Sequence, residues 1–309
     1  MNQVTLKISE AASSQMVLPI LVLYNRTPET SETYRTLIAS AHSASLNPDL
    51  IAVYDNSQIR QVRVAEEKYL FAYKHDPSNS GIAAAYNWAL DIAKSHGFTW
   101  LLLLDQDTSL PVTFLASLYH TLNVYNTNKS VTAIVPTVTD RGVVISPKHV
   151  RFGRLAPLPK LLPQVAEYEV TAINSGVAIR VKFMASLGGF NPAYRLDCLD
   201  HWLFRQLYAR GKRVALSDTV LEHNLSVSDY RNQVSLTRYR SILSAEVLFV
   251  TTQKRRAEIP VYVTRLLLRA VKQIVTYRRP DMAVLTCAMI AAMIFRCARF
   301  HNVERNEQY

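Results

Sequence analysis

The chain has 309 residues, of which 49% are hydrophobic, and a formal net charge of +11. This composition excludes wholesale disorder and allows one large α/β domain with a small appendage. Cys198, Cys287 and Cys297 lack paired or metal-binding spacing, and the first fifteen residues lack a basic start followed by an apolar run, so we expect a reduced, intracellular protein without a secretory signal.

The excess of positive charge lies mainly in the C-terminal part of the chain, from Lys254 onward. A basic surface suggests a nucleic acid, an anionic lipid or an anionic substrate as partner. The sequence has no interleaving of basic and aromatic residues and no recognised nucleic-acid motif, so we expect no nucleic acid partner.

Short apolar segments alternate with helical segments through the first hundred residues. We expect strands at 17–24, 50–54, 69–74 and 100–104, and helices at 29–45 and 81–96. This alternation predicts an α/β fold with a mostly parallel sheet that carries helices on both faces.

Polar residues follow these four predicted strands. They are Asn25, Asp55-Asn56-Ser57, Asn79-Ser80-Gly81 and Asp105-Gln106-Asp107. In open α/β sheets, ligands bind beyond the carboxyl ends of the strands. Turn chemistry explains any one of these groups, but it explains all four together less well. The pattern indicates a ligand site at one edge of the sheet.

Two carboxylates follow the apolar run Leu101–Leu104. If strand geometry continued through residue 107, Asp105 and Asp107 would point to the same face. Two like charges there repel each other unless a cation neutralises them, and Mg²⁺ or Mn²⁺ suits carboxylate oxygens. A D-x-D pattern alone is also typical of an ordinary acidic turn.

The second half has a less regular pattern. Val131–Val135 reads as a strand, and a proline-rich surface connection follows it. A helix is expected to end near Arg210, with Gly211 as its C-terminal cap. The remaining expected strands are 214–216 and 219–222, the last of which precedes His223.

The tail from about Tyr239 is predicted to be helical. Arg265, Arg269, Lys272 and Thr276 form one stripe, and Leu266, Leu267, Ala270 and Ile274 lie mostly away from it. This pattern fits a helix on an anionic bilayer surface. The fourteen uncharged residues between Asp281 and Arg296 reach about 21 Å, short of the roughly 30 Å of a hydrocarbon core. The alternatives are a helical pair that covers the catalytic domain, or a homodimer interface.

Seven motifs in order resemble family 2 glycosyltransferases with the GT-A fold, over residues 18–240. They are Tyr24-Asn25, Asp55-Asn56-Ser57, Asn79 to Ala83 with Ala85 and Asn87, Asp105-Gln106-Asp107, Asn174-Ser175-Gly176, Gly188-Gly189-Phe190, and Asp197 to Asp200 with Arg205 behind. The DQD form, the pair Asp197 and Asp200, and Glu222-His223 most resemble the bacterial rhamnosyltransferase branch. Two positions depart from the pattern, because His201 follows Asp200 in place of a second acid and Val22-Leu23 replace a proline.

The resemblance implies a role for each matching residue. It implies donor contacts by the nucleotide-binding group, Tyr24, Asn25, Asp55, Asn79, Gly81 and Asp105. It implies that Asp107 holds the metal, with His223 as a further metal or diphosphate ligand. Asp200 would be the general base, and the acceptor or supporting group would be Asp197, His201, Trp202 and Arg240.

Structural explanations remain open for several of these residues. Asp197 and Asp200 could be helix N-caps, His223 an ordinary core histidine, and Trp202 part of the core. Arg240 could equally be a solvated surface charge.

The function implied is an inverting, Mg²⁺- or Mn²⁺-dependent transferase. It would move L-rhamnose from dTDP-rhamnose to a lipid-linked saccharide in O-antigen-like polysaccharide synthesis. Alternatives are a galactofuranosyl- or hexosyltransferase with a UDP-sugar, and a non-catalytic membrane scaffold. Residues 1–240 would be the GT-A catalytic domain, with its nucleotide-binding half at 17–110 and its acceptor half at 130–240. Residues 241–309 would be the membrane-associated helical appendage, on the cytoplasmic face of the plasma membrane.

Overall fold

The computed structural model describes residues 16–47, 51–63, 67, 70–151, 154–159, 164–223, 234–255 and 257–306, with side chains up to residue 294. The chain divides into two compact units, residues 1–224 and residues 225–309. The predicted boundary at residue 240 lies inside a helix of the second unit, α6 (Leu236–Gln253).

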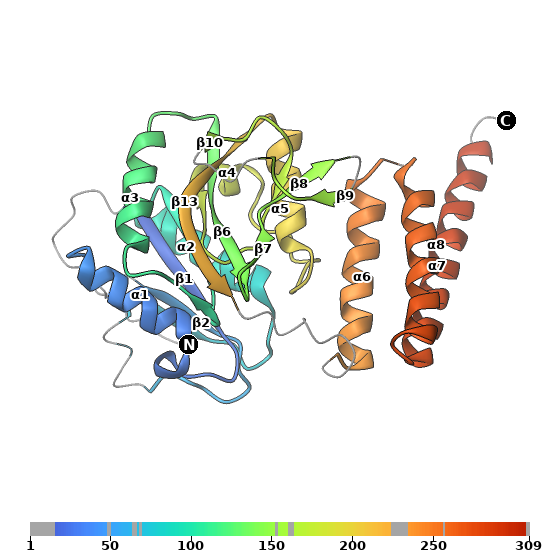
Figure 1. The fold of residues 1–309 in the computed structure, drawn as a ribbon, viewed down its shortest axis with the longest axis horizontal. Helices are drawn as coiled ribbons and strands as arrows, with labels where there is room; N and C mark the ends of the chain where they lie inside the picture. The colour runs from blue at the N-terminus through green and yellow to red at the C-terminus, as the bar shows by residue number, and fades with distance from the viewer. Residues whose placement is uncertain are drawn as a thin grey trace. The chain divides into compact units, whose positions relative to one another are not determined.

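The first unit is built on a mixed sheet whose N-terminal half is parallel (Figure 1). The strand order is β10-β13-β6-β12-β4-β1-β2-β3. The parallel half consists of β1 (Val17–Leu23), β2 (Ala52–Asp55), β3 (Ala72–His75) and β4 (Trp100–Asp105).

One antiparallel strand joins the two halves of this sheet. β12 (Val177–Arg180) lies between β4 and β6 (Val131–Asp140) and runs antiparallel to both. β13 (Arg213–His223) then runs parallel to β6. The short strands β10 (Gln164–Val165), β5 (Thr108–Ser109) and β7 (Val143–Ser146) complete the sheet at β13 and β6.

Helices cover both faces of this sheet, as the strand pattern predicts. α1 (Glu32–Ser43) follows the short 3-10 turn η1 (Pro28–Thr30), and together with α3 (Phe114–Tyr125) it packs on β1 and β4. α2 (Ile82–Ser95) packs on the same two strands from the other face (Figure 1). The strands β1 and β4 are almost continuously buried, which explains why their sequences are apolar without alternation.

The second half differs from the sequence expectation in two places. The predicted strands 214–216 and 219–222 form one strand, β13, which is irregular between Leu216 and Val220. The proline-rich segment contains pairing strands, because β8 (Lys148–Arg151) pairs with both β9 (Arg154–Ala156) and β11 (Val170–Thr171). Two helices, α4 (Val181–Ser186) and α5 (Leu199–Ala209), complete the unit.

The second unit consists of α6, α7 (Glu258–Val275) and α8 (Pro280–Asn306). Its apolar cluster includes Tyr239, Leu243, Leu266 and Met282. None of these helices is long and apolar enough, over the described residues, to cross a membrane.

Ion pairing within this unit corrects the predicted basic stripe. Arg269 donates to Glu246 at 2.8 Å, and Tyr262 donates to the same carboxylate at 3.0 Å. Leu266 and Ala270 are buried in the unit's own core. Arg269 therefore stabilises the packing of α6 on α7, and it is not one of the free surface cations.

Candidate functional site

The loops that follow the four parallel strands are hydrogen-bonded to one another. The backbone N–H of Asn25 donates to Ser57 Oγ at 2.7 Å, which ties the loop after β1 to the loop after β2. The backbone N–H of Asp76 donates to the Asp55 carbonyl at 2.8 Å, which ties β3 to β2. The predicted polar strand ends therefore form one connected edge of the sheet.

Gln106 connects the acidic turn to the first loop. The Tyr24 N–H donates to Gln106 Oε1 at 2.8 Å, and Gln106 Nε2 donates to the Tyr24 carbonyl at 3.2 Å. The D-x-D pattern points to the two aspartates beside Gln106 and predicts no role for the glutamine. Its two-way contact fixes the backbone of Tyr24 while the Tyr24 side chain stays 51% exposed.

Asp55 lies completely inside the protein. Its carboxylate accepts hydrogen bonds from the Ser57 N–H (3.0 Å), the Gln61 N–H (2.7 Å) and the Tyr73 hydroxyl (2.9 Å). Burial and then this hydrogen bond to Asp55 raise the pKa of Tyr73. These contacts shape the loop after β2, and the nucleotide contact of Asp55 stays a prediction.

Asp76 shapes the loop that leads into α2. Its carboxylate accepts from the backbone N–H groups of Ser78 (3.1 Å) and Ser80 (2.9 Å) and from the Tyr54 hydroxyl (2.9 Å). Burial acts to raise the pKa of Asp76, but its hydrogen bonds, above all those from Ser78 and Ser80, outweigh burial and hold the pKa well below the usual range. Asp76 was not among the predicted site residues, although Asp before Pro-Ser-Asn-Ser is a typical turn signal.

Gly81 brings this loop against the segment that precedes α5. It has a φ of +93°, and a Cβ built at this position would lie 2.2 Å from the Arg195 carbonyl oxygen. That carbonyl accepts from the Ile82 N–H at 2.7 Å, and the Arg195 guanidinium donates to the Asn79 carbonyl. The loop at 79–81 is therefore connected to the segment that carries Asp197 and Asp200.

A second clamp joins α2 to the glycine pair. Asn87 accepts from the Phe190 N–H at 2.7 Å and donates to the Phe190 carbonyl at 2.8 Å. Gly189 has a φ of +102°, and a Cβ there would lie 2.4 Å from Asn87 Oδ1. This contact gives the Asn87 and Gly188-Gly189-Phe190 motifs a shared structural role.

The prediction that Asp105 and Asp107 point to the same face of one strand is wrong, because the strand ends before Asp107. β4 stops at Asp105, and residues 106–107 form a turn, so a turn and not the strand pleat orients Asp107. Asp105 accepts from Ser175 Oγ at 2.6 Å. Burial raises the pKa of Asp105; Ser175 and His223 oppose this rise, while the charges of Asp107 and Asp200 add to it.

His223 reaches the acidic turn through strand pairing. β5 pairs with β13 so that Thr108 is opposite His223, and His223 Nδ1 lies 2.8 Å from Thr108 Oγ1. The same nitrogen lies 3.6 Å from Asp107 Oδ1. The structure therefore brings Asp107 and His223 together, although His223 is also buried and hydrogen-bonded as a core histidine would be.

Asp107 and His223 are the two side chains at this turn that could ligate a divalent cation. A bound diphosphate would supply the other ligands. No set of three His, Cys, Asp or Glu side chains suitable for a metal exists within the described part of the chain. Mg²⁺ is commonly held by one or two carboxylates together with substrate phosphates. Asp107, whose side chain is 29% exposed, fits that mode and not an all-protein cage.

Asp200 lies in the first turn of α5, where its Oδ1 accepts the His201 N–H at 2.7 Å. The charge of Asp200 adds to the raised pKa of Asp105. His201 Nδ1 lies 2.9 Å from Thr171 Oγ1. Trp202 is buried beside Tyr194. This position agrees with the alternative in which Trp202 is part of the core.

The remaining predicted residues are Asn25, Asn79, Asp197 and Arg240. Asn25 and Asn79 are exposed and have positive φ angles of 52° and 49°. Asp197 is half-buried before α5. Arg240 is exposed on α6 in the second unit, so its acceptor role stays a prediction.

Three buried polar atoms in or beside these motifs have no hydrogen-bond partner among the described residues: Asn56 Oδ1, Tyr86 Oη and Asn174 Oδ1. Burial raises the pKa of Tyr86, and the charges of Asp105 and Asp200 add to this rise. Buried polar groups are normally satisfied by protein, water or ligand. Within the described chain, Trp100 Nε1, Tyr168 Oη and Gln273 Nε2 are unpartnered in the same way outside these motifs. The three atoms at the motifs are therefore available to a polar ligand but do not by themselves mark a site.

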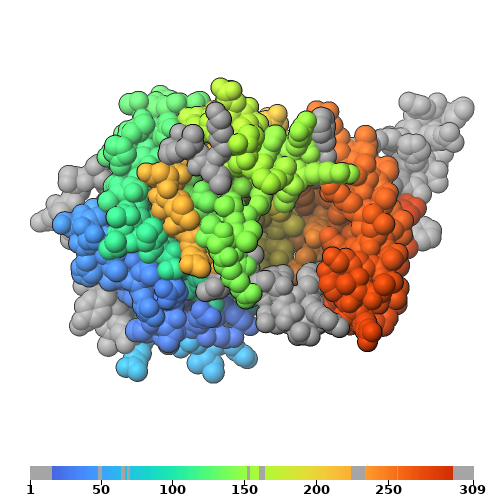
Figure 2. Space-filling model, in the orientation of Figure 1, coloured from blue at the N-terminus to red at the C-terminus, as the bar shows by residue number. Residues whose placement is uncertain are grey.

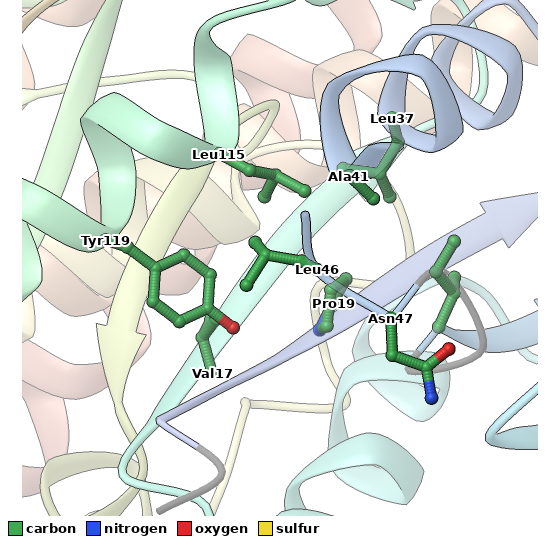
Figure 3. A pocket seen from close by; sticks show the side chains of 9 residues that line it. Val17, Pro19, Leu37, Ala41, Leu46, Asn47, Leu115 and Tyr119 are labelled. Carbon is green, nitrogen blue, oxygen red and sulfur yellow. The ribbon is translucent and has the colours of Figure 1, made fainter. Parts of the chain in front are cut away.

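The pocket in Figure 3 is a different feature. Its nine lining residues include Leu37, Ala41, Leu115 and Tyr119 from α1 and α3 and Val17 from β1 (Figure 3). Its volume of about 30 Å³ is about one water molecule's share of liquid. This pocket is a packing gap under the two helices, and it has no carboxylate.

Comparison with known proteins identifies the family. The model of "Glycosyl transferase family 2" matches residues 20–185, more than half of the chain. The chain belongs to this family, and the predicted α/β GT-A fold with a C-terminal helical appendage is confirmed. A search of curated proteins found no match.

Among solved structures, the chain is similar to S. aureus TarS. The match covers 90% of this chain and 53% of the TarS chain, at 14% identity and a TM-score of 0.48. For S. aureus TarS 1–349 in complex with UDP, the identity is 15% and the TM-score 0.48, with 89% of this chain and 88% of that chain covered. For the complex with UDP-GlcNAc, the identity is 14%, the TM-score 0.46, and the coverage again 89% and 88%.

Proposed function

We propose that this chain is an inverting glycosyltransferase that uses a nucleotide-diphosphate sugar. The observation that carries the proposal is the contact between His223, at the end of β13, and Asp107, in the turn after β4. Asp105 at the end of β4 and Asp200 in the first turn of α5 complete the set of acidic side chains. Membership of glycosyl transferase family 2 supports the same class of reaction.

Each group has a chemical task in this proposal. The acceptor hydroxyl attacks the anomeric carbon, its proton passes to Asp200, and the bond from that carbon to the diphosphate oxygen breaks. One base and no nucleophile give a single displacement with inversion. Asp107, with help from His223, would hold Mg²⁺ or Mn²⁺, and the ion would supply electrostatic stabilisation of the leaving diphosphate.

The geometry around Asp200 supports its role as the base. Oδ1 accepts the His201 N–H, and within the described structure Oδ2 has no hydrogen-bond partner. The residue lies in the first turn of α5. A carboxylate with one oxygen free of protein hydrogen bonds can accept a proton from a hydroxyl beside it.

We further propose dTDP-L-rhamnose as donor and a lipid-linked saccharide at the cytoplasmic face of the bacterial plasma membrane as acceptor. The support is the motif set Asp105-Gln106-Asp107, Asp197 with Asp200, and Glu222-His223. The product would then be an intermediate in the synthesis of an O-antigen-like polysaccharide. A UDP-galactofuranose or UDP-hexose donor would leave the reaction class unchanged.

The test is a nucleotide-sugar panel with a lipid-linked acceptor extract, read as release of dTDP or UDP. We expect Asp200→Asn and Asp107→Asn each to lower kcat by about 10²-fold or more, as loss of a general base or a metal ligand does. A chelator should abolish turnover, and added Mg²⁺ or Mn²⁺ should restore it.

The matched control is Asp91→Asn, because Asp91 is an aspartate on α2 with a side chain 77% exposed. It should leave kcat unchanged. Full turnover by both Asp107→Asn and Asp200→Asn would show that the mechanistic assignment is wrong. Absence of turnover with every donor, with nucleotide binding also absent, would favour the scaffold alternative.

A further inference from the structure

The helix α7 has two apolar sides, and only one of them is buried in the second unit. Tyr262, Leu266 and Ala270 face the unit's core. The exposed apolar face of α7 consists of Val261 (48% exposed), Leu267 (49%), Leu268 (66%), Val271 (58%), Ile274 (56%) and Val275 (73%). At 100° per residue these six side chains occupy one continuous side of the helix, opposite the buried one.

Cations border this face. Arg265 follows Val261 by four residues and Lys272 follows Leu268 by four, so both lie along the same edge of the face. Neither residue forms an ion pair in the described structure, and the Lys272 ammonium lies 5.1 Å from the centre of the Tyr277 ring. The helix has one acidic residue, Glu258 at its first turn, and Glu258 pairs with Lys254.

The charge of the whole second unit has the same sign. Residues 225–309 contain 14 Lys and Arg against 6 Asp and Glu, a net +8 of the chain's +11. Like charges on two copies of this surface would repel each other, whereas an anionic surface would attract it. The combination of an exposed apolar face with a cationic border therefore fits an anionic bilayer better than a second copy of the chain.

We propose that α7 lies in the interfacial plane of an anionic lipid bilayer, with the exposed apolar face of α7 inserted between the headgroups. Arg265 and Lys272 extend from the border of this face to lipid phosphates. This proposal rests on the proposed function only through the location of the acceptor at the membrane. The sequence pattern gave this helix an apolar side made of Leu266, Leu267, Ala270 and Ile274. The structure buries Leu266 and Ala270 in the unit's core, so the inserted side is the exposed apolar face of α7.

The test is sedimentation of the full chain with vesicles, without donor or acceptor. One set is phosphatidylcholine with about 30% phosphatidylglycerol and the other is phosphatidylcholine alone. We expect Leu268→Asn/Val271→Asn to weaken binding to the anionic vesicles by about tenfold or more, since both side chains lose their transfer into hydrocarbon.

The matched control is Val143→Asn/Leu155→Asn, which removes two side chains of the first unit that are 65% and 55% exposed. Its binding should equal that of the wild type. Arg265→Gln/Lys272→Gln should weaken binding to the anionic vesicles and leave any binding to phosphatidylcholine alone unchanged.

Wild-type vesicle binding by the α7 variant would overturn the proposal, provided its far-UV circular dichroism equals the wild type's. If that variant instead converts a dimer to a monomer and vesicle binding persists, the face belongs to a second copy. If the variant loses its circular dichroism, Leu267→Asn/Ile274→Asn on the same face decides by the same criteria. Nucleotide release measured on the same preparations with a water-soluble acceptor analogue and no vesicles keeps failure of this inference separate from failure of the transferase proposal.

Discussion

At the scale of single residues, backbone conformation explains the glycine in the Asn79-Ser80-Gly81 motif better than ligand contact does. Gly81 has a positive φ and touches the Arg195 carbonyl, and it thereby joins the loop before α2 to the segment before α5. A side chain at this position would push those two segments apart. The distance between the donor loop and Asp200 therefore depends on a residue that has no side chain.

Replacing Gly81 with alanine should cost about 2 kcal/mol or more of unfolding free energy, because a Cβ meets backbone atoms that cannot rotate away. The measurement is urea unfolding followed by tryptophan fluorescence, since Trp88, Trp100 and Trp202 all lie in the first unit. Gly97→Ala is the control, because Gly97 also has a positive φ, +74°, but open space around it. Equal costs for the two variants would contradict the contact with Arg195.

At the scale of elements, the loop from β3 to α2 is organised by one carboxylate. Asp76 binds two backbone N–H groups of this loop and the hydroxyl of Tyr54 on β2. Its lowered pKa means that folding favours the ionised form. This contribution to stability is present above the ordinary aspartate pKa of about 3.9 and is lost as the pH falls from there through the folded pKa.

We expect Asp76→Asn to reduce the unfolding free energy by about 1–3 kcal/mol at pH 7, because an amide cannot accept all of these hydrogen bonds. The difference from the wild type should shrink as the pH falls below about 4. Urea unfolding of both proteins between neutral and acidic pH measures this. A gap that stays constant across that range would mean that the charge of Asp76 does not stabilise the loop.

At the scale of the whole molecule, charge and chemistry belong to different units. The first unit contains the carboxylate cluster and has a net charge of +3, with 21 Lys and Arg against 18 Asp and Glu in residues 1–224. The second unit has +8. Screening by salt should therefore affect the proposed membrane contact more than the proposed reaction.

Raising NaCl from about 0.05 to 0.5 M should release most of the chain from anionic vesicles, because the attraction of basic residues to the lipid surface is screened. Nucleotide release with a water-soluble acceptor analogue should change by less than about twofold over the same range, since its short-range contacts are screened much less. Cosedimentation and a nucleotide-release assay on one preparation measure both quantities. Binding that persists at high salt would indicate that apolar insertion alone holds the protein.

The elements of the first unit were predictable because hydrophobic periodicity is a local property. The strands β1 and β4 are apolar runs buried on both faces, and the sequence marks them almost to the residue. β13 was not predictable as one strand, because its continuity past Leu216 depends on pairing with β6 and β5, which no local pattern encodes.

The residue composition of the candidate site was predictable, but the partners of its side chains were not. The order of motifs indicated Asp105, Asp107, Asp200 and His223. Hydrogen bonds with distant residues determined that Asp55 is enclosed by protein donors and that Gln106 holds Tyr24. Asp76 and Asn87 acquired structural roles in the same way.

Residue type and short spacing predicted the family, the alternation of strands and helices, and the polar strand ends, because these are local properties of the chain. Which of the polar groups face each other depends on the fold. Thr108 and His223 are 115 residues apart and meet through the pairing of β5 with β13. Likewise, Arg269 does not belong to the free basic surface, because it is paired with Glu246 on another helix. Such contacts depend on sheet order and helix packing, which are properties of the whole chain.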